Sequence, residues 1–393
     1  MRAVLAREMD CRRVLGRFCS GWRRGLGVRP VPEDAGFGTE ARHQRQPRGS
    51  RQRSGPLGDQ PFPGLLPKNL SREELVDALR AAVVDRKGTV LGRLYSAEKD
   101  RYGFCSQGRN GFLSNGRNGC QKINEQVTSG PLVTLNKPQG LPVTGKPGEL
   151  TLFSVLPELS QSLGLREQEL QVVRASGKES SGLVLLSSCP QTASRLQKYF
   201  IHARRAQRPT AIYCAVTDGI PAASEGKIQA ALKLEHIDGV NLTVPVKAPS
   251  RKDILEGVKK TLSHFRVVAT GSGCALVQLQ PLTVFSSQLQ VHMVLQLCPV
   301  LGDHMYSARV GTVLGQRFLL PAENNKPQRQ VLDEALLRCL HLTPSQAAQL
   351  PLHLHLHRLL LPGTRARDTP VELLAPLPPY FSRTLQCLGL CLQ

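Results

Sequence analysis

The sequence predicts an α+β fold with a mixed, mostly antiparallel central sheet that is flanked by helices. From residue 131 onward, short apolar runs of strand length alternate with stretches that repeat at helical spacing. Hairpin-type turns between these runs outnumber regular strand–helix–strand units, which favours antiparallel pairing. The expected strands cover residues 131–135, 183–187, 212–216, 265–269 and 275–279. The expected helices cover residues 152–163, 193–203, 251–261, 287–297 and 329–341.

A further helix is expected before this region, at 70–88. Ser71 and Glu74 form an S-x-x-E capping box, in which each residue's side chain bonds the other's backbone N–H. An apolar stripe at helical spacing runs from Leu75 to Val83, and Gly88 is the expected end of the helix. The stripe indicates that the helix packs on the main domain.

The first 30 residues have the composition of a mitochondrial presequence. They contain eight arginines, no lysine and two acids. If this segment is helical, Val14, Leu15, Phe18 and Trp22 share one face and arginines cover the rest. An Arg-rich, acid-poor amphipathic segment is typical of mitochondrial targeting. The alternative is a basic tail that contacts RNA directly.

Two further segments show no sustained apolar period. Residues 31–69 are rich in Pro, Gly, Arg, Gln and Ser, and residues 89–130 contain G-R-N-G twice. Neither segment buries enough apolar surface to offset its ordering entropy. The predicted organisation is a presequence at 1–30, a disordered linker at 31–69, an amphipathic helix at 70–88, a flexible insertion at 89–130 and the main domain at 131–393.

The charge of the chain favours a polyanionic partner. Its 393 residues include 51 Lys and Arg against 30 Asp and Glu, a formal net charge of +21. Nucleic acid is the first candidate and an anionic membrane surface the second. No apolar run approaches the roughly 20 residues that a membrane span needs. The eleven cysteines include no C-x-x-C pair, which indicates reduced thiols rather than disulfides or a zinc site.

Four sequence blocks, followed by a closing block, resemble RluA-type pseudouridine synthases in the family's own order. Residues 135–143 are similar to the family's N-K-P-x-G-x-x-V segment and place Lys137 at its rim. Residues 211–219 are similar to the strand K-x-Y-x-A-x-V-x-G: Tyr213 matches, and Ala211 takes the place of the Lys. The closing block, residues 354–378, is similar to the final L-H-x-x-x-L strand and its Pro-rich exit.

The block at 173–186 resembles H-R-L-D-x-x-T-S/T-G-L-L-L-L, the motif that carries the family's catalytic Asp. Aligned on its S-S-G, the motif places Gly177 at the Asp position, and an alternative gap places Ser176 there. Neither supplies a carboxylate. The nearest one is Glu179, two positions later, which either replaces the Asp or is a solvated loop residue.

The last large block, residues 279–306, resembles L-x-P-x-T-G-R-x-H-Q-I-R-V-H followed by G-D-x-x-Y. Thr283, Gln288 and Asp303 match the pattern. The active-site Arg has become Phe285, the His has become Ser287, and the second Arg has become Gln290. Loss of the Asp together with its cationic partners predicts an altered catalytic centre in a retained fold.

The resemblance implies the pseudouridine-synthase fold and isomerisation of a uridine that is flipped out of its RNA stack, with no metal or organic cofactor. With the presequence, it implies mitochondrial mRNA or rRNA as substrate in the matrix, and mitoribosome-assembly proteins as further candidate partners. The alternative is an impaired family member that binds RNA or assists ribosome assembly without turnover. The candidate catalytic residues are Glu179 and Tyr213.

Basic residues near the expected cleft are the candidate RNA contacts. We assign this role to Lys137, Lys178, Arg195, Lys198, Arg204, Arg205 and Arg208. A second basic patch comprises Lys247, Arg251, Lys252, Lys259 and Lys260. The alternating His353, His355 and His357 are interpreted as the polar face of a strand, because no carboxylate or Cys completes a metal set.

Overall fold

The structure is a computed structural model. It describes residues 62–67, 69–84, 132–165, 170–237, 239–321, 327–362 and 370–391. The predicted presequence at 1–30, most of the predicted linker at 31–69 and the predicted insertion at 89–130 lie outside these residues. No helix among the described residues is long and apolar enough to cross a membrane.

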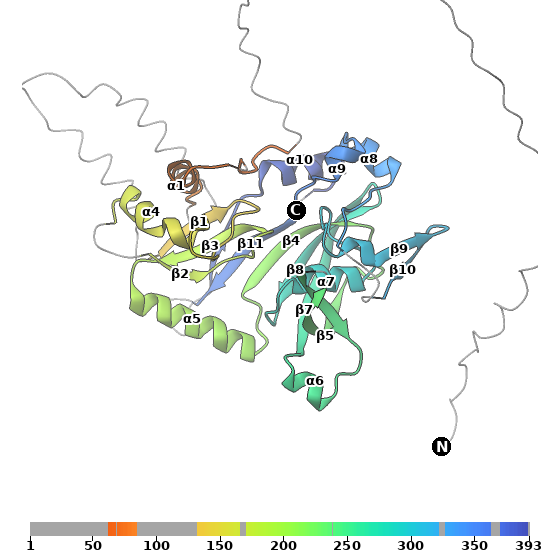
Figure 1. Ribbon diagram of the computed structural model, residues 1–393, viewed down its shortest axis with the longest axis horizontal. Coiled ribbons are helices and arrows are strands. Elements are labelled where there is room, and N and C mark those ends of the chain that lie inside the picture. The colour runs from red at the N-terminus through yellow and green to blue at the C-terminus, as the bar shows by residue number, and fades with distance from the viewer. Residues whose placement is uncertain are drawn as a thin grey trace, which may run out of the picture. The chain divides into compact units, whose positions relative to one another are not determined.

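A ten-stranded sheet forms the centre of the fold (Figure 1), and this confirms the predicted α+β class. Its strand order is β1-β3-β11-β4-β8-β7-β5-β6, with β2 paired to β3 and β12 to β11. Among the described strands of this sheet, β3 and β11 run parallel and the other pairs run antiparallel. The strands are β1 (Leu132–Lys137), β2 (Gln171–Arg174), β3 (Ser181–Ser187), β4 (Ala211–Asp218), β5 (Glu225–Ile237), β6 (Val240–Val246), β7 (Lys259–Gly271), β8 (Cys274–Pro281), β11 (Leu354–Leu361) and β12 (Val371–Leu374).

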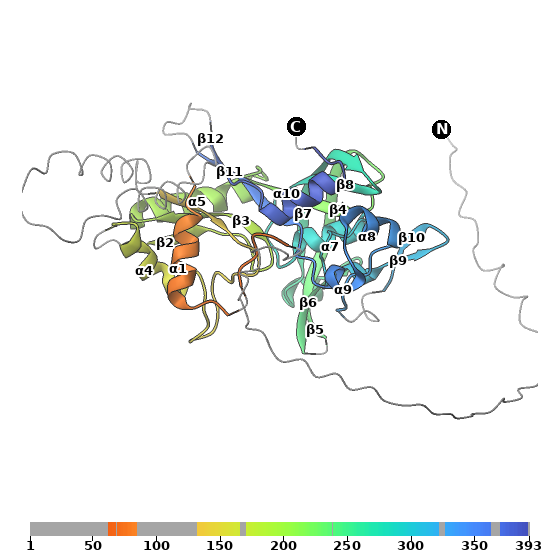
Figure 2. The same cartoon turned by 90° about the horizontal axis from the view of Figure 1, so that it is seen from above.

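Helices cover both faces of the sheet. On β3, Leu183 and Leu185 pack towards α5, whereas Val184 and Leu186 pack towards α1 and α4. Figure 1 shows α1 and α5 on opposite sides of these strands. In the other half of the sheet, α8 and α10 lie side by side over one face (Figure 2), and α7 packs on the other. The helices are α1 (Arg72–Ala81), α4 (Leu156–Ser162), α5 (Pro190–Arg205), α6 (Arg251–Leu255), α7 (Gln288–Leu295), α8 (Glu334–Leu340), α9 (Pro344–Ala347) and α10 (Pro379–Cys387), with 3-10 turns η1 (Phe153–Val155) and η2 (Ser307–Arg309).

The two halves of the sheet meet where β3 runs beside β11. The parallel register covers two pairs, His355 with Ser181 and Leu356 with Gly182. Gly182 has a φ of +114°, and a Cβ there would lie 2.3 Å from the Leu356 carbonyl oxygen. The hydroxyl of Ser181 lies 2.9 Å from His355 Nδ1 at the same level. The close approach of the two backbones therefore depends on the missing side chain at 182.

Two expected helices stop well before their predicted ends, and the helix expected at 329–341 begins only at Glu334, after the N-cap Asp333. The capping box of Ser71 and Glu74 is present, but α1 ends at Ala81 rather than near Gly88, because Val83 pairs with Leu135 at the edge of the sheet. The helix expected at 251–261 ends at Leu255. Gly257 follows with a φ of +99°, and β7 begins at Lys259. In both places the backbone forms hydrogen bonds with a neighbouring strand where the prediction had hydrogen bonds within a helix.

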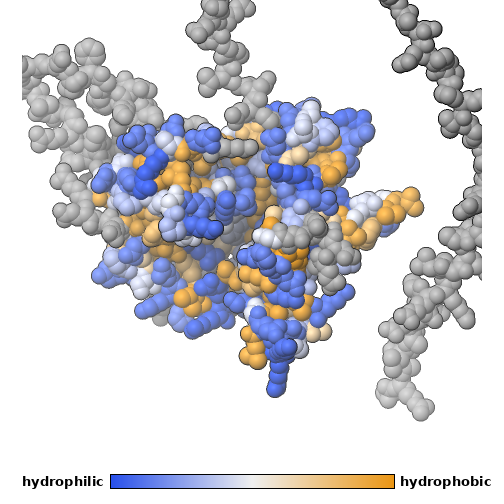
Figure 3. Space-filling view, in the orientation of Figure 1, coloured by the Kyte–Doolittle hydropathy of each residue, from blue (hydrophilic) through white to orange (hydrophobic). Residues whose placement is uncertain are grey.

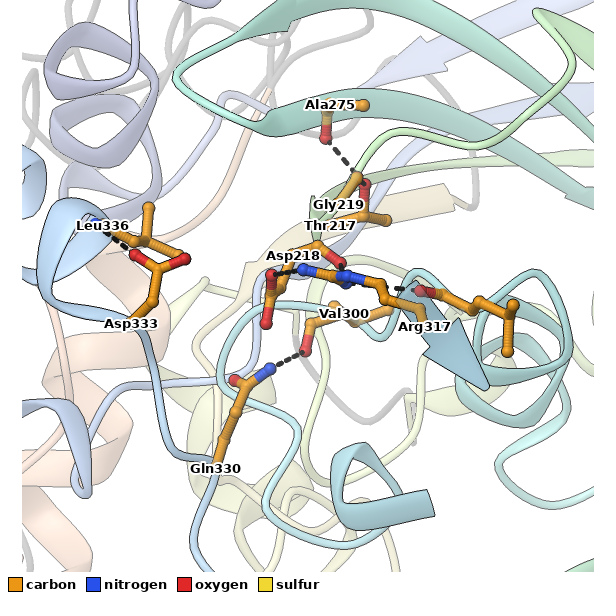
Figure 4. A network of polar contacts seen from close by, with 10 residues as sticks. Thr217, Asp218, Gly219, Ala275, Val300, Arg317, Gln330, Asp333 and Leu336 are labelled. Atoms are coloured by element: carbon orange, nitrogen blue, oxygen red, sulfur yellow. Dashed lines mark hydrogen bonds and ion pairs between the residues drawn. The ribbon is translucent and has the colours of Figure 1, made fainter. Parts of the chain in front are cut away.

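A two-stranded hairpin, β9 (Val310–Val313) and β10 (Gln316–Leu319), projects from the main sheet. Arg317 anchors it: Nη2 donates to Asp218 Oδ1 at 2.6 Å, and Nη1 donates to the Asp218 and Leu297 carbonyls (Figure 4). The guanidinium lies over Gly219, and any side chain at this position would clash with it. The tip is apolar (Figure 3), and Leu314 there is 99% exposed.

Candidate active site

A cavity of about 710 Å³ lies where three of the sequence blocks meet. One wall is the 174–180 segment between β2 and β3, and the opposite wall is the 281–290 segment between β8 and α7. The lining is completed by Tyr213 of β4, Leu234 of β5, Lys259 of β7, Leu352 and Leu354, the first residue of β11. Sheet topology thus gathers residues that are more than 100 positions apart in the sequence.

In the first wall, Gly177 is the position that leaves space for a larger side chain. It is exposed and lines the cavity, and the nearest atom to a Cβ built there is Ser180 Oγ at 3.9 Å. Ser176 is buried instead, and its hydroxyl lies 3.5 Å from the Ser180 carbonyl oxygen. Of the two positions that the motif offers for an Asp, Gly177 is the one whose side chain would face the cavity.

Lys137 is buried beneath this wall. Its Nζ lies within 3.3 Å of four backbone carbonyl oxygens, those of Pro138, Leu141, Lys178 and Ser180. Burial lowers the pKa of Lys137 to about 7, and the Glu179 carboxylate acts in the opposite direction. The expectation that Lys137 contacts RNA is wrong, because its ammonium is turned into the protein. Alternation along β1 is the signal that could have found this, since residues 133, 135 and 137 share its inward face.

Glu179 and Tyr213, the two candidate catalytic residues, line the same cavity. Glu179 is exposed, and its neighbours Lys178 and Ser180 are the residues whose carbonyls accept from Lys137. Tyr213 is half-buried. Burial raises the pKa of the Tyr213 phenol, and the charge of Arg174 lowers it.

Arg174 is the residue that sequence reasoning missed. It ends β2 and lines the cavity, and its Cζ lies 5.4 Å from the centroid of the Phe200 ring. Its Nε is buried and has no hydrogen-bond partner among the described residues. The charge of Arg174 lowers the pKa of both Tyr213 and Arg204. The signal in the sequence is that a basic residue, Arg174, takes the first His position of the H-R-L-D motif.

The opposite wall carries the altered positions of the last block. Phe285 lines the cavity and packs on a buried apolar cluster that includes Leu232 and Val291. The wall is fixed by matching motif residues: Thr283 Oγ1 lies 3.0 Å from Gln288 Oε1, and Gln288 Nε2 donates to Ser263 Oγ at 2.9 Å. An apolar ring therefore stands where the family pattern has a guanidinium.

Gln290 donates a hydrogen bond to only one of the two carboxylate oxygens of Asp303. Gln290 Nε2 donates to Asp303 Oδ1 at 3.2 Å, and the Met305 and Tyr306 amides donate to the same oxygen. Asp303 Oδ2 is buried without a partner among the described residues. Burial raises the pKa of Asp303 to about 6, although these three hydrogen bonds lower it. Position 290 is an Arg in the family pattern, whereas here it is an amide that reaches one of the two Asp303 oxygens.

The predicted RNA contacts fall into separate places. Lys178 lines the cavity. Arg204 and Arg205 line an adjacent hollow of about 430 Å³ together with Lys259 and Lys260, which sequence analysis had placed in a second patch. Arg195 and Lys198 line a different hollow along α5. Exposed residues that line neither the cavity nor these two hollows are Arg208, Lys247, Arg251 and Lys252.

The alternating histidines do not form a solvated polar face. His353 and His355 are fully buried. His353 bonds the Pro351 carbonyl and Thr384, whereas His355 bonds Ser181. Burial lowers their pKa values, to about 4 for His353 and about 3 for His355. No cluster of three potential metal ligands occurs among the described residues.

The fold is that of the RNA pseudouridine synthase family, and the comparisons agree. The family model described as RNA pseudouridylate synthase matches residues 131–294. The chain belongs to this family, RluA type.

Individual relatives agree with this assignment. Over 393 residues, the whole of both chains, it is 87% identical to the Homo sapiens protein named mitochondrial mRNA pseudouridine synthase RPUSD3. It is 31% identical over 272 residues to the Mus musculus mitochondrial pseudouridylate synthase RPUSD4, covering 66% of this chain and 67% of that one. The solved structure of human RNA pseudouridylate synthase domain containing 4 superposes with a TM-score of 0.52 at 28% identity, covering 70% of this chain and 99% of the other.

Proposed function

We propose that the protein isomerises uridine to pseudouridine in mitochondrial mRNA or rRNA, in the matrix, and so supports translation. The observation that carries the proposal is the cavity that joins Glu179, Tyr213 and the 281–290 wall beside a basic hollow. The name of the 87% identical human relative supports mRNA as the substrate class, and the Arg-rich first 30 residues support import. Mitoribosome-assembly proteins are further candidate partners.

The reaction needs no cofactor. The C1′–N1 bond breaks, the uracil turns within the cavity, and C1′ bonds to C5. C5 loses a proton and N1 gains one, so atoms and electrons balance without a co-reactant. Glu179 is the carboxylate that acts at the sugar, either by adding to C1′ or as a base, and Tyr213 packs against the uracil. Arg174 supplies positive charge within the same cavity.

A second function is favoured by the altered positions. Gly177 leaves the motif without its carboxylate, and Phe285 leaves it without its guanidinium. Near-attack geometry tolerates little displacement, since about 1 Å can cost on the order of a hundredfold. The alternative is therefore an RNA-binding or ribosome-assembly protein that uses the same cavity without turnover.

One depletion experiment separates the two functions. Pseudouridine is mapped in mitochondrial RNA after depletion and after rescue with the wild-type chain, Glu179→Gln or the control Glu149→Gln. Loss of specific sites on depletion, restored by wild type and the control but not by Glu179→Gln, supports the enzyme and its base. Unchanged modification with impaired ribosome assembly supports the binding protein. Full rescue by Glu179→Gln removes Glu179 from the mechanism.

A further inference from the structure

A basic hollow adjoins the cavity. Its rim consists of Arg204 and Arg205 in the last turn of α5 and Lys259 and Lys260 at the start of β7. Its floor is formed by Thr261 and Leu282, which are both buried. Two elements 50 residues apart in the sequence thus place four cations around one depression of about 430 Å³.

The four cations face no acid in this hollow, because its lining residues include neither Asp nor Glu. None of the ion pairs among the described residues involves them. The last turn of α5 favours basic side chains because of the helix dipole, which accounts for Arg204 and Arg205 but not for the lysines of β7. Burial lowers the pKa of Arg204, and the neighbouring charge of Arg174 adds to this. Crowded like charges without a counter-ion indicate a site for a polyanion.

The hollow is continuous with the cavity. Lys259, Thr283 and Val284 line both spaces. Val284 is 52% exposed, so an apolar side chain stands in solvent on the ridge between a basic depression and a base-sized cavity. Its neighbour Phe285 is directed into the cavity wall and packs on the core, which leaves Val284 as the apolar group that faces outward on this ridge. Proteins that unstack nucleic acids insert apolar side chains of this kind between neighbouring bases.

We propose that this hollow binds the phosphodiester backbone of single-stranded RNA next to the reacting nucleotide, and that Val284 enters the base stack as a wedge. The backbone passes over Arg204, Arg205, Lys259 and Lys260, and the base beyond the wedge turns into the cavity. The inference rests on the proposed action on RNA. It adds the path of the strand and the residue that separates two bases.

Measurements of RNA binding, which need no turnover, test the proposed path of the RNA backbone. The full-length chain is titrated with fluorescein-labelled dodecauridylate at several salt concentrations. The variants are Arg204→Ala/Arg205→Ala and Lys259→Ala/Lys260→Ala. The matched control is Arg338→Ala/Arg383→Ala, which removes two exposed charges from α8 and α10 that line neither the cavity nor the hollows of α5. We expect each of the first two to raise Kd about tenfold or more and to reduce the salt slope by about 1.4, or 0.7 per phosphate contact. We expect less than a twofold change in the control. Equal effects of all three, or no effect of the first two, would overturn the path.

Base unstacking tests the wedge. A dodecauridylate with one central 2-aminopurine becomes more fluorescent when that base leaves the stack. We expect this rise with the wild-type chain and with the control Val313→Ala, an exposed valine of the projecting hairpin, and its loss with Val284→Ala at a Kd changed less than about threefold. A full rise with Val284→Ala would overturn the wedge. Both readouts are independent of pseudouridine formation, so a chain that binds as expected but never isomerises uridine refutes the enzyme and leaves the RNA path standing.

Discussion

The ammonium of Lys137 lies 2.8 Å from the carbonyl oxygen of Ser180, the residue that follows the candidate base Glu179. The carbonyl of Lys178, on the other side of Glu179, lies 3.3 Å from the same nitrogen. The buried Lys137 amino group thus holds the backbone on both sides of Glu179, the carboxylate among the described residues that lines the cavity. The position of Glu179 depends on a residue that never reaches the substrate.

Replacing Lys137 with Met should therefore disturb both stability and the cavity wall. The Pro138 and Leu141 carbonyls would lose the donor that Nζ supplies, whereas the Lys178 carbonyl keeps the Gly140 amide at 2.9 Å. We therefore expect the free energy of unfolding to fall by about 2 kcal/mol. Urea denaturation measures the change. Lys198→Met, on the exposed side of α5, is the control and should change stability by less than about 0.5 kcal/mol. Equal stability of the two variants would contradict the anchoring role.

Gly177→Asp should add activity. The cavity has room for the new side chain, since the nearest atom to its Cβ is 3.9 Å away. A carboxylate there would stand where the family motif has its Asp, and we expect single-turnover pseudouridine formation to rise about tenfold or more. Gly177→Asn has the same size without the charge and serves as the control. If Asp and Asn behave alike, the position does not supply the catalytic oxygen.

Gln290→Arg should satisfy the second oxygen of Asp303. In the wild type, burial raises the pKa of Asp303 to about 6 from 3.8, so the folded state binds more protons and loses stability as pH rises from about 4 to 6. A guanidinium at 290 would lower that pKa and remove this loss. We expect a gain of about 1 kcal/mol at pH 8, measured by urea denaturation across this pH range. Gln290→Met provides no charge and removes a hydrogen bond that lowers the Asp303 pKa, so the loss of stability with rising pH should persist and extend above pH 6. A lower stability of Gln290→Arg at pH 8 would show that the site cannot accept the pair.

The buried histidines should make the fold sensitive to acid. The pKa of His353 falls from 6.5 to about 4, so the unfolded state binds a proton more readily, and stability is lost as pH falls from 6.5 towards 4. The shift corresponds to about 3 kcal/mol. We expect His353→Gln to flatten this part of the pH profile, although its stability at pH 8 falls. The exposed His236→Gln is the control, and a profile of His353→Gln parallel to wild type would refute the assignment.

The sequence predicts the elements whose signals are local. The capping box of Ser71 and Glu74 and the fully buried run of β3 are both observed. Strands β5 and β6 were missed because their burial follows no clean alternation. The helix expected beyond Leu255 fails because Gly257 adopts a left-handed conformation and the following residues pair with β5.

The site shows the same division between local and long-range information. Motif order is enough to place Glu179, Tyr213 and Phe285 around one cavity. It does not reveal that the Lys137 ammonium points inward or that Arg174 points into the cavity, because side-chain direction depends on strand register. It also does not join Arg204 to Lys259, since α5 packs on β2 and β3 whereas Lys259 begins β7, and only the tertiary arrangement brings the two residues to one hollow.

Gly182 has a consequence beyond the pairing of two strands. The wall with Gly177 and Glu179 continues directly into β3, whereas Phe285 and Tyr213 belong to the half of the sheet beyond β11. The contact between Gly182 and Leu356 therefore joins the two parts of the sheet that carry the two walls of the cavity. Any side chain at 182 would push β3 away from β11 and widen the cavity between its two walls. The hydrogen atom that stands in place of a side chain at 182 thus sets the spacing between the two walls of the cavity.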